Sequence, residues 1–228
     1  MILNSKSLMV IAAHPDDEVL GCGGTLARLK KRNCIINTVF VSDGVSSREN
    51  NSFKNKKLIN QRYSSAKRVG KILGSKRIEF LSFPDNNLDQ VGLLTIVKEL
   101  EKKIKKYKPD TILTHSLKDL NIDHKLVHMS VITATRPQNL NTVKKIYSFE
   151  ILSSTEWNFS ENNFKPNHFI DISKELKLKI KVMKIYKSEL RKWPHPRSIY
   201  GIEILSKYRG QSVGMRAAEA FSLVRSFE

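Results

Sequence analysis

The 228-residue chain contains only two cysteines, Cys22 and Cys34. They are too few for the disulfide framework of a small secreted protein, and neither belongs to a Cys-x-x-Cys pair. Long apolar runs are also missing near the start of the chain. The longest one there, residues 8–13, is too short to span a bilayer or to form a signal-peptide core. We therefore expect a cytoplasmic protein with two structural thiols.

Acidic residues are scarce relative to basic ones, since 22 Asp and Glu stand against 40 Lys and Arg, a formal net charge of +18. Clustered basic residues bind nucleic acids through counterion release. In residues 98–108 and 174–192, however, Lys alternates with Leu, Ile and Val near a 3.6-residue period, which is typical of amphipathic helices with a solvated basic face. We therefore expect no nucleic-acid partner. The positive field would instead attract an anionic substrate or bring the protein near acidic lipid head groups.

Strand-like and helix-like segments alternate along the chain. The predicted strands cover residues 8–13, 35–41, 78–83, 111–114, 146–152 and 168–172. The predicted helices cover residues 23–32, 58–73, 93–106, 125–135 and the Lys-rich stretch 174–192. Such alternation predicts an α/β fold with a mostly parallel sheet and helices on both faces. Because no repeat or linker interrupts the chain, we expect a single domain over residues 1–228.

The stretch AAHPDDEVLGCGG, residues 12–24, places a histidine and three acids directly after the first predicted strand. Three adjacent carboxylates repel one another unless a cation lies nearby. Parallel sheets bind their ligands beyond the carboxyl ends of the strands. Polar segments also follow the second and fourth predicted strands, at residues 41–50 and 115–124. We therefore expect all three segments to meet at one rim of the sheet.

His14, Asp17 and His124 are candidate metal ligands at this rim. Two imidazoles and a carboxylate with an open fourth position are the arrangement of catalytic zinc. Zinc lowers the pKa of its bound water to about 7, so hydroxide is available at neutral pH. Asp16, whose side chain should diverge from that of Asp17, is then the candidate general base. Asp123, beside His124, is a candidate for orienting a neighbouring group.

The same residues permit other interpretations. An Asp-Asp pair after a strand also caps helices or binds Mg²⁺, and an isolated His124 would be an ordinary surface histidine. His124 and His128 lie four residues apart, on one face of a predicted helix, and could form a ligand pair of their own. Spacing alone leaves these alternatives open.

The stretch AHPDDEVLGCGGTLARL, together with Asp123 and His124 at the start of a later helix, resembles the PIG-L / LmbE-like family of zinc-dependent de-N-acetylases. The similarity covers roughly residues 8–225 and includes SDG, QRYSSAKRVGKILG and FPDNNLD. FEILSSTEW, FIDIS, PHPRS and AEAF in the carboxyl-terminal half resemble the branch that occurs with polysaccharide and lipopolysaccharide biosynthesis. The resemblance implies a Rossmann-like fold and hydrolysis of the N-acetyl group of an N-acetylglucosamine-type sugar.

By this resemblance, His14, Asp17 and His124 bind one Zn²⁺ or another divalent metal, Asp16 is the general base, and Arg62 contacts the sugar. Nucleotide-linked or lipid-linked precursors of a surface glycan are the implied substrates. The sequence leaves open whether the protein lies near a membrane or forms a homo-oligomer.

Two positions depart from the family pattern. The family's second motif commonly begins with a histidine where this chain has Asn121, which can donate a hydrogen bond but cannot transfer a proton. We keep Asn121 and Asp123 as candidate substrate-binding residues. His195, within WPHPRS, is our candidate oxyanion stabiliser, with packing in a Pro-bounded turn as the alternative. Ser65 stands where a glutamate often follows the arginine, so the local support of Arg62 is missing.

A rival hypothesis is a sugar- or nucleotide-sugar-binding protein that keeps the fold but has lost turnover because Asn121 breaks the proton relay. A protein that only binds sugar needs neither a complete ligand set nor Asp16. The sequence therefore favours the hydrolase.

Overall fold

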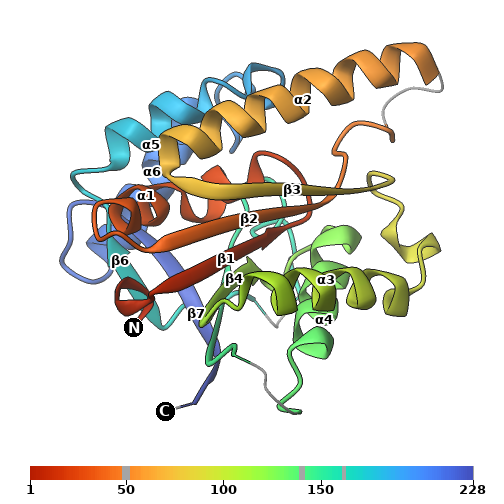
Figure 1. Cartoon of the computed structure of the whole chain (residues 1–228). Helices are drawn as coiled ribbons and strands as arrows, with labels where there is room; N and C mark the ends of the chain where they lie inside the picture. Colours follow the sequence, from red (N-terminus) through yellow and green to blue (C-terminus); the bar gives the residue numbers. More distant parts are fainter. Residues whose placement is uncertain (48–51, 139–141, 161–162, 228) are drawn as a thin grey trace.

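Seven strands form one sheet in the order β3-β2-β1-β4-β5-β7-β6 (Figure 1). This computed structural model describes residues 1–47, 52–138, 142–160 and 163–227. The first five strands in this order pair in parallel, whereas β7 is antiparallel to both β5 and β6. The strands are β1 Ser7–Ala12, β2 Ile35–Ser42, β3 Ser75–Phe83, β4 Thr111–His115, β5 Lys145–Phe149, β6 His168–Asp171 and β7 Ala218–Ser226.

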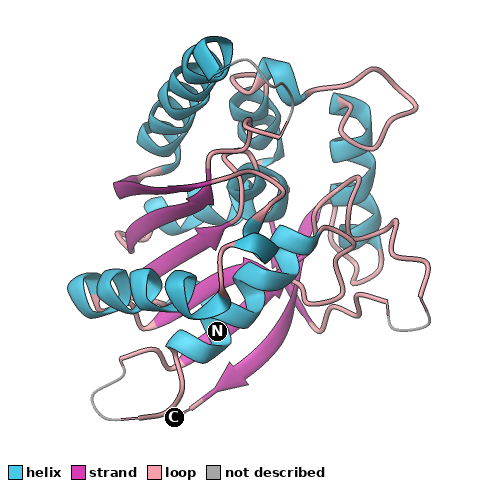
Figure 2. Cartoon of the chain, turned by 90° about the vertical axis from the view of Figure 1, so that its right-hand side faces the viewer, coloured by secondary structure: helices cyan, strands magenta, loops and turns pink. Residues whose placement is uncertain are grey.

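Helices cover both faces of the sheet (Figures 1 and 2). One face is covered by α1 Asp17–Lys30, α2 Ser52–Leu73, α5 Leu176–Met183 and α6 Ile199–Gln211. The other face is covered by α3 Leu93–Tyr107 and α4 Ile122–Ala134. In the described part of the chain, no helix has both the length and the apolar character needed to cross a membrane.

Strand β1 is the centre of the core. Leu8 and Val10 pack toward α1 and α2, whereas Met9 and Ile11 pack toward α3 and α4. All four side chains are fully buried. Because both faces of the strand are covered, its sequence is a continuous apolar run rather than an alternating one.

The predicted α/β class is confirmed, and the fold is Rossmann-like. The prediction that residues 174–192 form one helix is wrong, because α5 ends at Met183 and only the short 3-10 segment η3, Lys187–Glu189, follows. Tyr186, between them, is buried in the core and donates a hydrogen bond to Glu18, a tertiary contact that outweighs the helical periodicity.

Helix α1 begins at Asp17 rather than at residue 23, so the acids of the first motif occupy its first turn, where they complement the helix dipole. Helix α6 and strand β7 lie in a stretch for which the sequence predicted no element. Strand β5 ends at Phe149 instead of residue 152, because the chain turns there.

The strand order reverses beside β1. Strand β1 pairs with β2 on one side and with β4 on the other, so the crossovers after β1 and β4 leave toward opposite faces of the sheet. A crevice forms at such a switch point, beyond the carboxyl ends of the two strands. The segments that begin at His14 and at His115 both enter it.

A buried ion pair holds the break within α1. The break is at Cys22, where φ is −147°. The Glu219 carboxylate accepts hydrogen bonds from the amides of residues 24 and 25, at 2.8 and 2.7 Å, just beyond the break. Nζ of Lys179 lies 2.7 Å from Glu219 and donates to the carbonyl of Leu20, just before the break, at 2.8 Å. The pair thus satisfies backbone groups on both sides of it.

We predict that Lys179→Met lowers the free energy of unfolding by about 3–5 kcal/mol, because it leaves the Glu219 carboxylate buried without its counter-charge. Chemical denaturation would measure the loss. Lys31→Met is the matched control, because Lys31 also pairs at 2.7 Å, with Glu175, but its side chain is 63% exposed. That change should cost less than about 1 kcal/mol. Equal losses in the two variants would contradict the role assigned to the buried pair.

Candidate metal centre

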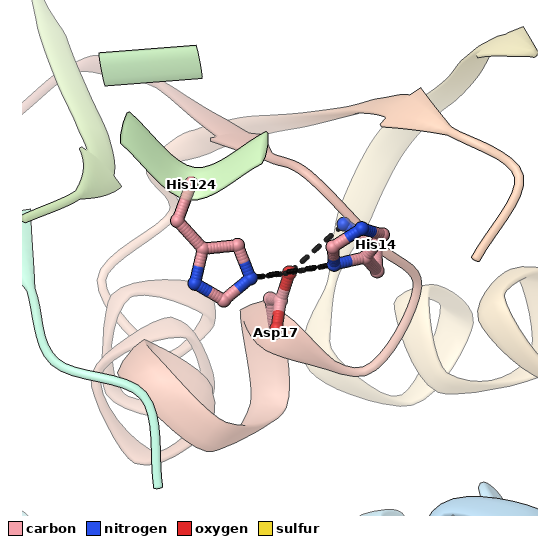
Figure 3. A group of neighbouring side chains, drawn as sticks. All are labelled: His14, Asp17 and His124. Atoms are coloured by element: carbon pink, nitrogen blue, oxygen red, sulfur yellow. Dashed lines mark hydrogen bonds and ion pairs between the residues drawn. The ribbon is translucent and has the colours of Figure 1, made fainter. Parts of the chain in front are cut away.

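Three of the predicted ligands meet in the crevice (Figure 3). His14 follows β1, Asp17 is the first residue of α1, and His124 lies in the first turn of α4. Oδ2 of Asp17 lies 3.4 Å from Nδ1 of His14 and 3.5 Å from Nε2 of His124. The two imidazole nitrogens are 3.3 Å apart. Residues separated by 110 positions therefore direct their donor atoms at one point.

These separations fit a tetrahedral cation. Donor atoms held ~2.0–2.1 Å from a tetrahedral Zn²⁺ lie about 3.3 Å from one another. All three side chains are buried. Oδ1 of Asp17 has no hydrogen-bond partner among the described residues, and a buried carboxylate oxygen without a partner is costly. The donor set and its burial therefore suit a divalent metal.

Two carboxylates orient His14 from behind. Its Nε2 lies 3.1 Å from Oδ1 of Asp85 and 3.1 Å from Oδ2 of Asp123. With a metal bound, these oxygens would hold the ring proton on Nε2 and leave the lone pair of Nδ1 for the metal. Burial alone would lower the pKa of His14, but its hydrogen bonds to Asp123, Asp17 and Asp85 raise this pKa well above its usual value.

Asp119 performs the same function for His124. Its Oδ1 lies 3.1 Å from Nδ1 of His124, which favours a proton on Nδ1 and a free lone pair on Nε2. The hydroxyl groups of Ser154 and Thr155 donate to the Asp119 carboxylate. Burial would raise the pKa of Asp119, but His124 and these hydrogen bonds lower it to about 2. The residue is therefore ionised at neutral pH.

Asp16 faces a different environment from Asp17. Its φ of 137° is strained for a residue with a side chain. The backbone amide of Asp16 donates to the Glu18 carboxylate at 3.0 Å, and this carboxylate also accepts from Tyr186. Its carboxylate oxygens lie 3.4 Å from Arg197 and 3.9 Å from Arg62. Burial raises the pKa of Asp16 to about 6, and the charge of Arg197 opposes this shift. The three adjacent acids thus have three separate sets of partners.

Arg62 obtains its acidic partner from a distant segment. Its guanidinium group forms an ion pair with Glu189 of η3 and donates to the carbonyl of Pro15 at 2.8 Å. Glu189 also lies 3.7 Å from Arg197. Glu189 thus supplies the support that is missing at Ser65. The contact of Arg62 with a sugar stays a prediction.

Asn121 and Asp123 connect α4 to the loop before η2, Leu88–Gln90. Asn121 caps α4, because its Oδ1 accepts from the amide of Asp123 at 2.8 Å, while its Nδ2 donates to Asn86 at 2.8 Å. The carboxylate of Asp123 accepts from the amides of Asn86 and Leu88 at 2.8 and 3.1 Å. Their contacts with a substrate stay predictions.

His195 lies in a turn between η3 and α6. Its Nδ1 accepts a hydrogen bond from the amide of Arg197 at 3.0 Å, so the ring proton is on Nε2. Partial burial and the charges of Arg191 and Arg197 lower the pKa of His195, which leaves a neutral imidazole with one donor. Its role at the oxyanion stays a prediction.

His128 does not point to an alternative ligand pair. Its Nδ1 is 2.8 Å from the carbonyl of His115, to which it donates. Within the described ranges, two groups of side chains could hold a metal ion, the predicted ligand set and a second group of His14, Asp85 and Asp123. His128 belongs to neither group. His115 is instead stacked on His124, with ring centroids 3.9 Å apart, and its Nε2 accepts from the amide of Ala13.

The polar segment after β2 reaches the same rim. The hydroxyl of Ser46 accepts from the amide of Asp85 at 2.9 Å, and Ser47 donates to the Asp85 carboxylate. Residues 48–50 of this predicted loop lie outside the described residues.

Four charged residues of the site were missed by the sequence analysis: Asp85, Asp119, Arg197 and Glu189. Asp85 and Asp119 are acids in loops that follow predicted strands, and this position could have identified them as site residues. Glu189 lies in the stretch that the periodicity assigned to one helix, and Arg197 lies in a stretch that was left unassigned. No local pattern therefore connects either residue with Asp16.

Comparisons with known proteins give a matching family model and similar relatives. A model of the PIG-L family, described as GlcNAc-PI de-N-acetylase, matches residues 9–135. A diacetylchitobiose deacetylase of Thermococcus kodakarensis is 26% identical over 230 residues, which cover 96% of this chain and 83% of the relative.

Solved structures share the fold. An N,N'-diacetylchitobiose deacetylase from Pyrococcus horikoshii, in complex with an inhibitor, superposes with a TM-score of 0.79 and 22% identity over 97% of this chain and 85% of that one. GalB, a 4-carboxy-2-hydroxymuconate hydratase from Pseudomonas putida, gives a TM-score of 0.74 and 22% identity over 98% of both chains. The fold therefore accommodates more than one reaction.

We predict that Asp119→Asn weakens Zn²⁺ binding roughly 10- to 100-fold, because it removes the charge that orients His124. Competition with a chromophoric chelator would measure the dissociation constant. Asp89→Asn is the control, since Asp89 is an exposed acid in η2. If the two variants bind Zn²⁺ equally well, Asp119 does not orient a ligand.

Proposed function

Because the chain belongs to the PIG-L family, whose model matches more than half of its length, we propose that it is an N-deacetylase of amino sugars. The deacetylase among its relatives acts on diacetylchitobiose, according to its name, and supports an N-acetylglucosamine-type substrate. The net charge of +18 supports an anionic one, such as a nucleotide-linked or lipid-linked precursor of a surface glycan.

The proposed cofactor is Zn²⁺ on His14, Asp17 and His124, supported by the 3.3–3.5 Å separations of their donor atoms. Zn²⁺ at such a site supplies Lewis-acid polarisation of a carbonyl and lowers the pKa of water. Asp85, Asp123 and Asp119 keep the two imidazoles in the tautomers that a metal requires.

Asp16 is the proposed acid and base. As a carboxylate it takes a proton from the water that attacks the amide carbon, and as a carboxylic acid it gives this proton to the nitrogen when the C–N bond breaks. The products are acetate and the free amine. The raised pKa of Asp16, about 6, supports both steps, because each form is accessible near neutral pH. Asn121 then needs no acid function.

His195 is the proposed donor to the developing oxyanion. Its neutral ring carries the proton on Nε2, which supports a hydrogen bond from that atom. Such a donor contributes most when negative charge accumulates on the carbonyl oxygen.

One observation carries the proposal: a buried ligand set of two imidazoles and a carboxylate lies beside a carboxyl group, Asp16, that is held in a separate direction. The test is metal analysis of the purified protein followed by an acetate assay on N-acetylated sugars, including UDP-N-acetylglucosamine and N,N'-diacetylchitobiose. Released acetate supports the deacetylase, since hydration of a double bond releases none. Bound metal without acetate from any sugar would favour the sugar-binding protein.

Asp16→Asn should reduce turnover by about 100-fold or more while metal content stays unchanged, because an amide cannot accept the water proton. Acetate release and metal analysis on the same preparation measure both quantities. Unchanged turnover would assign the base to another group.

His195→Ala should lower kcat roughly 100-fold without loss of metal, which is typical of removing one oxyanion donor. Single-turnover kinetics would show whether the chemical step has slowed. A variant with the full rate would make His195 a structural residue.

A further inference from the structure

Trp157 forms an aromatic pair with His195, the proposed oxyanion donor, but Trp157 itself has no part in the mechanism above. Trp157, one of only two tryptophans, is 40% exposed. Its ring meets that of His195 edge-to-face, with centroids 5.7 Å apart and planes at 77°. A large aromatic side chain that stays exposed while its position is fixed is typical of a binding surface.

The turn that carries Trp157 is attached to the loop that supports His124. The hydroxyl of Thr155 donates to Asp119 at 2.5 Å, and Asp119 lies against His124. One residue after Trp157, the side-chain Nδ2 of Asn158 donates to the carbonyl of Lys118 at 2.8 Å. Trp157 is thus flanked on both sides by contacts to the loop before α4.

A second set of contacts connects Trp157 to Asp16. His195 accepts the amide hydrogen of Arg197, and Nη1 of Arg197 lies 3.4 Å from the Asp16 carboxylate. The Arg197 side chain also donates to the carbonyl of Leu152, at the start of the turn that bears Trp157, at 3.4 Å. The aromatic pair is therefore fixed relative to both a metal ligand and the proposed base.

The chemistry of such a surface matches a sugar ring. The face of an indole carries negative quadrupole charge, and the C–H groups on one face of a pyranose are apolar and weakly positive. Tryptophan loses little conformational entropy when it binds, because only two torsions are fixed. The nearby Nε2 of His195 and the Arg197 guanidinium add polar donors of the kind that orient a ligand in an aromatic-lined site.

We propose that Trp157 is the platform for a second pyranose ring, linked by a glycosidic bond to the sugar that carries the acetamide. This inference rests on the proposed function and specifies its substrate class, because the substrate is then an oligosaccharide or an oligosaccharide glycolipid rather than a nucleotide-linked monosaccharide.

Phe159 provides a matched control on the same turn. It is 90% exposed, and its amide donates to the carbonyl of Trp157. A general apolar contact, such as one with a lipid surface, would use the most exposed aromatic ring of the turn. A sugar subsite beside the metal centre requires the fixed ring of Trp157.

The kinetic test compares kcat/KM for acetate release from N,N'-diacetylchitobiose and from N-acetylglucosamine. The wild-type protein should prefer the disaccharide, and Trp157→Ala should reduce that preference roughly 10-fold, mainly through KM. Trp157→Phe, which retains a ring face, should keep most of it, and Phe159→Ala should keep all of it. Absence of a preference in the wild type, or equal losses in Trp157→Ala and Phe159→Ala, would overturn the proposal.

A binding test separates this inference from the proposed function. In the Trp193→Phe variant Trp157 is the sole tryptophan, so its fluorescence should change saturably with the disaccharide. The Trp157→Phe variant, in which only Trp193 remains, should show no such change. Saturable binding without acetate release would refute the deacetylase and retain the subsite. If the fluorescence of Trp157 does not respond, the subsite is refuted, whatever the activity.

Discussion

The burial of the Asp17 carboxylate is the constraint on which the site depends. This side chain is fully buried, and burial alone would raise its pKa, but the surrounding imidazoles of His124, His115 and His14 hold the pKa well below its usual value. A buried negative charge requires positive or polar partners on every side. Imidazoles supply them here, and each ligand imidazole is in turn backed by carboxylates. Carboxylates and imidazoles therefore alternate outward from Asp17, and a divalent cation would supply the positive charge that neutral imidazoles lack.

A second alternating array surrounds Asp16 and combines Arg62 with two residues of the carboxyl-terminal half, Glu189 and Arg197. Arg197 and Arg62 both face Asp16, and Glu189 lies between the two guanidinium groups. The family model covers the residues of the ligand set but stops at residue 135, before Glu189 and Arg197. The amino-terminal half thus holds the proposed metal ligands, while the carboxyl-terminal half supplies Arg197 and Glu189 to the surroundings of the proposed base. The antiparallel insertion of β7 between β5 and β6 ties that second half to the sheet.

The sequence predicted those parts of the molecule that depend on local patterns. Strands such as β1 were predicted because continuous apolar runs follow from burial on both faces, and the candidate ligands were proposed because polar groups follow strands at the switch point. The break at Cys22, the shortened α5 and the role of Arg197 could not be predicted in this way. Each depends on a partner far along the chain, such as Glu219 for the break and Tyr186 for the end of α5. Local periodicity contains no record of such contacts.

The fold alone does not determine the reaction, since a hydratase has the same architecture. The reaction depends instead on the directions in which the side chains of neighbouring residues point. In the HPDDE motif the strained φ of Asp16 turns consecutive carboxylates into different environments, as the proposed roles of Asp17 in the ligand set and of Asp16 in proton transfer require. Backbone strain of this kind persists only where surrounding contacts enforce it, and the hydrogen bond from the Asp16 amide to Glu18 is one such contact. The third acid thus helps to hold the first two in different directions, which gives each of the three successive carboxylates a separate set of partners.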